Sequence, residues 1–155
     1  MCAIAKTTMP RKLTYAGRES NSYVYFALSS DVDFDPDLIT KALDLQPTST
    51  RRKGDPVPKT TSWTLQQFVG SSPDLESATK YLIGLLQPKA KLIMTLMKKH
   101  NLIAQMIFKV DVDIHPEVST PYFPLDKRTI EFLHRTTTEV DFDIYKVDSR
   151  GVHLK

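Results

Sequence analysis

The chain has 155 residues and a net charge of +3, and it is 41% hydrophobic, 25% charged and 9% aromatic. These values are typical of one globular domain with a real core, and they exclude collagen-like, disordered and coiled-coil sequences. The small net charge does not by itself indicate nucleic-acid binding. Cys2 is the single cysteine, so neither an intrachain disulfide nor a cysteine zinc site is available. The sequence contains no apolar run long enough for a membrane span or a secretory signal, so we expect a cytoplasmic protein.

The first 20 residues show no sustained periodicity, and we expect an arm at 1–20, one domain at 21–148 and a tail at 149–155. Residues 23–28 are rich in aromatic and branched side chains with one consistently apolar face, which predicts a strand. An Asp-Pro pair then begins a pattern of apolar residues at helical spacing that ends near residue 45. We therefore expect a short helix packed on the first strand.

The next segment, residues 46–59, holds three prolines and one glycine, a composition that predicts a long loop without a ladder or a helix. Loops of this length are uncommon in compact domains unless they have a function. The basic run Arg51, Arg52 and Lys53 is therefore a candidate surface for an acidic partner or a phosphate, although a solvated basic turn is the simpler alternative. Gly54 matches no phosphate-loop spacing, and we expect it to supply a positive φ angle in a turn.

Alternation at residues 62–66 predicts a second strand, and apolar residues at a period of 3.6 predict helix over 74–100. Pro88 lies inside that pattern and predicts a kink or a split into two consecutive helices. Asn101 follows this pattern, and we expect it to end the helix in the left-handed backbone conformation. The even positions of residues 102–114 are apolar and most odd positions are polar, which predicts a long, half-buried strand.

A short helix near residues 125–133 and a last strand over 140–145 complete the order β-α-β-α-β-α-β. Strands that are polar on one face favour antiparallel pairing over a parallel sheet buried on both sides. We therefore predict an α+β fold: a mainly antiparallel four-stranded sheet with helices packed on one face, a ferredoxin-like sandwich.

Four acidic side chains occupy the polar face of the last two strands: Asp111, Asp113, Asp141 and Asp143. If these strands are neighbours, the carboxylates share one face, and a cationic partner would offset their repulsion. These aspartates, with Tyr145, form our candidate partner-binding surface. A weaker alternative is a divalent metal held by Asp111, Asp113 and His115 in a metal-binding protein or metal-dependent enzyme. The simplest alternative is a solvated face neutralised by Lys109 and Lys146.

Tyr23, Tyr25 and Tyr145 offer an aromatic platform on which bases or a small ligand would stack, with residues 51–53 as cations. A phosphate backbone laid over the aspartates would be repelled, so we do not expect nucleic acid as the partner. The four histidines are dispersed and no serine lies in a nucleophile elbow, so we expect no enzymatic activity and no cofactor. The sequence does not indicate an oligomeric state.

Several short motifs, in this order and spacing, resemble a family of small bacterial proteins, domain of unknown function 4279. They are Phe34-Asp35-Pro36, Leu45-Gln46-Pro47-Thr48, Arg52-Lys53-Gly54-Asp55, Thr61-Ser62-Trp63-Thr64-Leu65, Leu86-Gln87-Pro88-Lys89 and Asp141-Phe142-Asp143-Ile144-Tyr145. The similarity runs from about Tyr23 to Tyr145. Some small domains of this kind look like immunity proteins, which neutralise contact-dependent or polymorphic toxins by direct binding. The resemblance therefore implies a protein-binding module whose partner is a toxin domain, and a charged face would suit that role.

Overall fold

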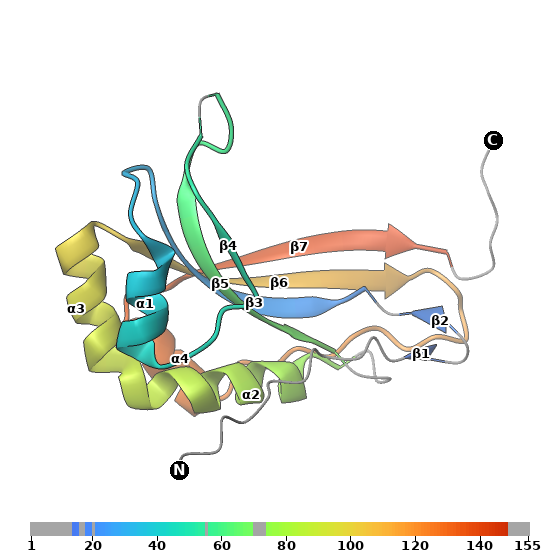
Figure 1. Cartoon of the computed structure of the whole chain (residues 1–155). Helices are drawn as coiled ribbons and strands as arrows, with labels where there is room; N and C mark the ends of the chain where they lie inside the picture. Colours follow the sequence, from blue (N-terminus) through green and yellow to red (C-terminus); the bar gives the residue numbers. More distant parts are fainter. Residues whose placement is uncertain (1–13, 16–17, 20, 55, 70–73, 149–155) are drawn as a thin grey trace, which may run out of the picture.

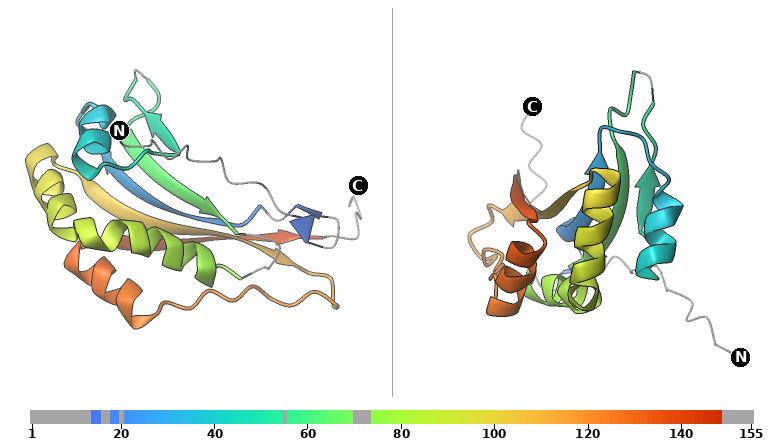
Figure 2. Two further views of the ribbon diagram at one scale, coloured as in Figure 1. Left: turned by 60° about the horizontal axis from the view of Figure 1, so that its bottom comes forward. Right: turned by 90° about the vertical axis from the view of Figure 1, so that its left-hand side faces the viewer.

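The computed structural model describes residues 14–15, 18–19, 21–54, 56–69 and 74–148. Its centre is a curved five-stranded sheet with the helices gathered on one side (Figures 1 and 2). The strand order is β4-β5-β3-β6-β7. The bounds are β3 Tyr23–Ser30, β4 Ser49–Arg51, β5 Thr61–Phe68, β6 Ile103–Asp113 and β7 Glu139–Val147. A separate two-stranded ladder pairs β1, Thr14–Tyr15, with β2, Arg18–Glu19, inside the segment predicted as an arm.

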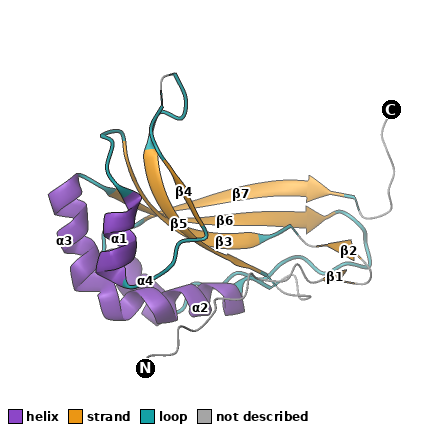
Figure 3. Ribbon diagram, viewed as in Figure 1, coloured by secondary structure: helices purple, strands orange, loops and turns teal. Residues whose placement is uncertain are grey.

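The helices lie between the strands in the chain, as the periodicity predicted (Figure 3). Their bounds are α1 Pro36–Leu43, α2 Glu76–Leu86, α3 Ala90–His100 and α4 Lys127–Arg135. A turn of 3₁₀ helix, η1 Gln87–Lys89, separates α2 from α3, which confirms the predicted interruption at Pro88. Asp35 caps α1 through its side chain, so the helix begins at the Asp-Pro pair as predicted. Asn101 ends α3 with a φ of 52°, which confirms the predicted left-handed cap.

The core lies between the sheet and the helices, where one face of every long strand except β7 is buried. Its largest fully buried side chains are Trp63, Phe26, Phe108 and Phe132. The indole nitrogen of Trp63 donates a hydrogen bond to Thr40 Oγ1 at 3.0 Å, so the one polar atom of this buried ring is satisfied.

The sheet differs from the prediction in two respects. It has five strands instead of four, and β7 pairs with β6 in parallel, although β3 is antiparallel to both β5 and β6. The connection from β6 to β7, residues 114–138, contains α4 and is long enough to return the chain to the start of a parallel strand. From β3 to β6 the elements follow one another in the order β-α-β-β-α-β, with α2 and α3 together as the second helical segment, and α4 and β7 are added after them.

The segment predicted as an unstructured loop contains β4, which pairs with β5 at the sheet edge. The Thr48 side chain strengthens this edge because Oγ1 accepts a hydrogen bond from Gln66 N at 2.9 Å and donates one to Gln66 O. Gly54 does not have the predicted positive φ angle. A glycine is needed there because a Cβ atom would lie 2.6 Å from the carbonyl oxygen of Val57.

In the part of the chain that the structure describes, none of the helices has both the length and the apolar character that crossing a membrane requires. Residues 70–73 and the predicted tail at 149–155 lie outside the described residues.

Candidate functional site

The sheet face away from the helices, which we call the open face, carries the polar positions of the strands. Two adjacent rows of paired residues cross it from β7 to β5: Asp143, Lys109, Tyr23 and Phe68, and then Asp141, Ile107, Tyr25 and Gln66. Because paired residues of neighbouring strands point to the same side, the register confirms that β6 and β7 are neighbours whose four aspartates share one face.

The exposed acidic groups are concentrated on β7. Glu139, Asp141 and Asp143 occupy alternate positions of this strand and are all exposed, and we call them the acidic edge. Gln105 donates a long hydrogen bond, 3.3 Å, to the Glu139 carboxylate. Three carboxylates along one side of an edge strand form a strip of negative charge that a cationic group can reach from solvent.

Asp111 is not part of this strip. Its carboxylate is paired with the ammonium group of Lys109, and their side chains are only 12% and 17% exposed. The same ammonium group lies 5.1 Å from the centroid of the Tyr145 ring, in a cation–π contact. Lys109 therefore neutralises Asp111, as the simpler sequence alternative proposed, and leaves Asp141 and Asp143 exposed. Lys146, the other lysine of that alternative, is paired with Val112 on the opposite face of the sheet.

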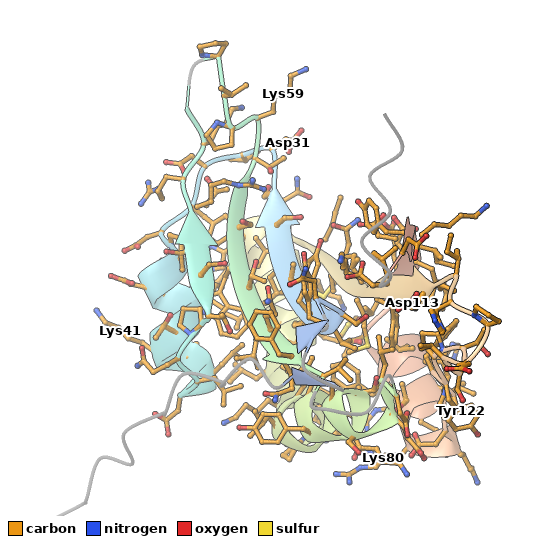
Figure 4. All side chains as sticks on the ribbon, turned by 90° about the vertical axis from the view of Figure 1, so that its right-hand side faces the viewer. Asp31, Lys41, Lys59, Lys80, Asp113 and Tyr122 are labelled. Carbon is orange, nitrogen blue, oxygen red and sulfur yellow. The ribbon has the colours of Figure 1, made fainter. Side chains whose placement is uncertain are left out.

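The weak metal candidates are engaged in local hydrogen bonds. An oxygen of Asp113 accepts the His115 backbone N–H at 2.9 Å, and His115 Nδ1 accepts the Glu117 N–H at 3.1 Å. Within the described residues, no group of three histidine, cysteine, aspartate or glutamate side chains is placed to hold a metal ion. Figure 4 shows Asp113 where the sheet gives way to the connection to α4, with Tyr122 farther along that connection.

The basic run does not form one cationic surface. Arg52 donates to Asp33 through Nε at 3.0 Å and through a second guanidinium nitrogen, and Lys53 Nζ donates to the Asp31 carbonyl. These contacts tie β4 to the loop between β3 and α1, and Asp31 lies there, away from Asp113 (Figure 4). Arg51 is paired with Ser62 and lies at the opposite edge of the open face from the acidic edge.

Exchange of Arg52 for alanine is expected to raise the pKa of Asp33. Hydrogen bonds from Arg52 and Thr61 lower the pKa of this carboxyl from 3.8 to about 2. The ionised form therefore stabilises the native state above pH 4, and this contribution is lost as the pH falls from about 4 to about 2. Titration of the Asp33 carboxyl by NMR should show a pKa that rises toward 3.8 in Arg52→Ala, where Thr61 still lowers it, and an unchanged low value in the control Arg51→Ala. A low value in both variants would contradict the assigned cause.

A shallow hollow of about 370 Å³ lies on the open face between β3, β4 and β5. Its lining combines aromatic rings, hydroxyls, an amide and one cation: Tyr23, Tyr25, Ser49, Thr50, Arg51, Ser62, Thr64 and Gln66. The two tyrosine rings lie 6.0 Å apart and tilted by 41°. The sequence analysis grouped Tyr23, Tyr25 and Arg51 as a candidate platform for a ligand, and these three residues line the hollow, whereas Tyr145 does not. The hollow itself was not predictable because it depends on β4, which was missed.

Charges from both sheet edges act on the centre of this face. Burial raises the pKa of Tyr25 above its ordinary 10.0, the neighbouring Tyr23 and the carboxylates of Asp143 and Asp141 raise it further, and Arg51 lowers it. Tyr25 is therefore a neutral hydrogen-bonding group at physiological pH. The open face is negative at β7, aromatic in the middle and positive at Arg51.

The apolar side of β7 is largely exposed. Val140, Phe142 and Ile144 alternate with the acidic residues, a pattern typical of a half-buried strand, yet they are 37%, 40% and 57% exposed. Phe142 stacks on Phe108 at 5.1 Å and lies 5.7 Å from Phe123 on the connection to α4. The buried Phe132 ring of α4 packs against Phe26 on the central strand β3 and not against β7. All nine residues of β7 are exposed.

Comparison with known proteins gives one family. The model described as Domain of unknown function (DUF4279) matches residues 19–147. No curated protein and no solved structure matches the chain. The family match contains every long strand and all four α-helices of the described structure, together with the acidic edge and the hollow. Because the match covers most of the 155 residues, the chain belongs to the family of proteins with this domain of unknown function, DUF4279.

Proposed function

We propose that the chain is a non-enzymatic protein-binding module, and in concrete terms a bacterial immunity protein that neutralises a toxin by binding a basic surface on it. The observation that carries this proposal is β7. It is a nine-residue edge strand exposed on both faces, with an acidic row on one side and an apolar row on the other. Native proteins usually shorten, cover or bend such edges, because an open edge pairs readily with other chains.

The chemistry of the two rows supports a protein partner more than a small molecule. The acidic edge supplies long-range attraction, which raises the rate and the selectivity of association with a basic surface. The apolar row supplies area that becomes favourable only when a partner removes it from water. An interface needs this combination, and neither row requires a catalytic group.

The first test is co-expression of the chain with the protein encoded by the reading frame next to its gene. We expect the neighbouring protein to stop growth when it is produced alone, and growth to return when this chain is produced with it. Purified together, the two proteins should elute as one complex. A neighbouring protein that is harmless, or whose toxicity this chain does not relieve, would contradict the proposal.

Charge reversal then locates the interface. We expect Asp141→Lys with Asp143→Lys to slow association with the toxin on the order of tenfold or more at low salt, because two attractive charges become repulsive. The matched control reverses two exposed acids elsewhere, Glu117→Lys with Glu131→Lys. Stopped-flow measurement at several salt concentrations checks the result. Equal slowing in both variants would show that only net charge matters and would exclude the acidic edge as the interface.

A further inference from the structure

We propose that β7 binds its partner by strand addition: an extended partner segment, with Lys or Arg alternating with apolar residues, pairs with the outer edge of β7 and extends the sheet. This inference rests on the proposed function, and it names the binding mode and the chemistry of the segment that is bound. Three features of β7 support it: the direction of its backbone groups, the character of its two faces and the poor fit of a second copy.

The backbone groups of even-numbered β7 residues point away from β6. The Val147 carbonyl accepts the Ile114 N–H at 2.9 Å, so this odd residue faces the chain that continues from β6. The Phe142 N–H is instead bonded at 2.8 Å by the carboxylate of Asp141, the residue before it. Successive residues of a strand direct their N–H and C=O groups to opposite sides. Val140, Phe142, Ile144 and Lys146 therefore direct theirs outward, where the described chain has no further strand.

The two faces of β7 define what the added strand must carry. On the open face its side chains would lie beside Asp141 and Asp143, which favours Lys or Arg. On the other face they would lie beside Val140, Phe142 and Ile144, which favours apolar residues. A strand has a side-chain period of two, so the partner segment must alternate basic and apolar residues.

A second copy of this chain fits the edge poorly. If β7 were laid antiparallel to β7 of another copy in full overlap, residue 139 would meet residue 147 and Asp143 would meet Asp143. A register shift of two residues would set Asp141 against Asp143. Like charges that lie directly opposite each other destabilise a sheet. Charge complementarity therefore favours a basic partner strand over self-pairing.

The test uses a short synthetic peptide in which lysine and valine alternate, together with two matched peptides. One is the same sequence with N-methyl groups on alternate residues, which keeps the charge and blocks backbone pairing. The other replaces lysine by glutamate. We expect the first peptide to bind by calorimetry and to protect the N–H groups of Ile144 and Lys146 from hydrogen exchange, and both control peptides to lose at least tenfold in affinity. Absence of binding by the first peptide, or equal binding by the methylated one, would overturn strand addition.

Two proline variants test the edge in the protein itself. Ile144→Pro removes an outward N–H and should leave the fold intact, because proline is tolerated where an edge N–H faces solvent. It should abolish peptide binding, whereas Ile144→Ala, which keeps the N–H, should retain most of it. Tyr145→Pro removes an inward N–H of the β6–β7 ladder and should lower the melting temperature clearly more than Ile144→Pro.

These outcomes separate the inference from the proposed function. If reversal of Asp141 and Asp143 slows toxin binding but Ile144→Pro does not weaken it, the acidic edge is the interface and strand addition is wrong. If sedimentation shows a dimer that Ile144→Pro dissociates, the occupant of the edge is a second copy and the inference is also overturned. Loss of both peptide and toxin binding in Ile144→Pro, with its melting temperature retained, supports strand addition.

Discussion

Replacing Phe132 with alanine is expected to lower the free energy of unfolding by about 3–5 kcal/mol, the usual cost of deleting a fully buried aromatic ring. Phe132 is 1% exposed, and its ring meets Phe26 on β3 edge-on, with centroids 5.9 Å apart. This contact holds α4, the helix of the β6–β7 connection, under the centre of the sheet. Urea denaturation followed by circular dichroism would measure the loss, and the melting temperature should fall by roughly 10 °C.

The control for this variant is Ile130→Ala. Ile130 lies on the same helix but is 54% exposed, so its truncation should change the free energy of unfolding by less than about 0.5 kcal/mol. A similar loss in both variants would mean that burial of the Phe132 ring is not its origin, and helix propensity cannot supply it because alanine is a better helix former than either residue. A small effect of Phe132→Ala would contradict the packing of α4 described above.

Replacing Thr40 with valine is expected to cost about 1–3 kcal/mol, although the two side chains have almost the same shape. The Thr40 hydroxyl accepts the hydrogen bond of the Trp63 indole at 3.0 Å, and Trp63 is fully buried. Valine would leave that N–H without a partner in an apolar environment. Equilibrium unfolding should show the loss, and the near-ultraviolet circular dichroism of the single tryptophan should report the changed surroundings.

Thr95 offers a matched control for Thr40. Both hydroxyls bond the carbonyl four residues earlier in their helix, but Thr95 is on an exposed part of α3. Thr95→Val should therefore be close to neutral. In a Trp63→Phe background the indole N–H is gone, and the additional cost of Thr40→Val should largely disappear. If the cost persists in that background, the hydrogen bond is not its origin.

The spacing of apolar residues predicted most of the helices and strands, because that spacing shows which face of each element is buried. The alternation over residues 102–114 predicted β6, and the helical period with Pro88 predicted α2 and α3. The direction of β7 was not predictable in this way, because alternation indicates a half-exposed strand whichever way it runs. Strand β4 was missed because its three residues are too few to show an alternation of apolar and polar side chains. Its position depends on Thr48, whose hydroxyl bonds to Gln66, a residue distant in the sequence.

The parity of the aspartates was enough to place them on one face, since a side-chain period of two is independent of strand direction. Which of the aspartates remain exposed and unneutralised was not predictable, because it depends on which carboxylate pairs with Lys109. The structure pairs Lys109 with Asp111 and leaves Asp141 and Asp143 exposed. The separation of Arg51 from Arg52 and Lys53 was equally inaccessible, because it requires the register of β4 on β5.

The exposure of β7 also has an evolutionary consequence. Substitution of the exposed acids of this strand removes little buried surface, so it should leave the stability of the fold nearly unchanged. If the acidic edge binds a partner, as we propose, relatives with different partners can diverge at positions 139, 141 and 143 while the residues around Trp63 and Phe132 stay under strong purifying selection. Recognition would then change rapidly on a scaffold that changes slowly.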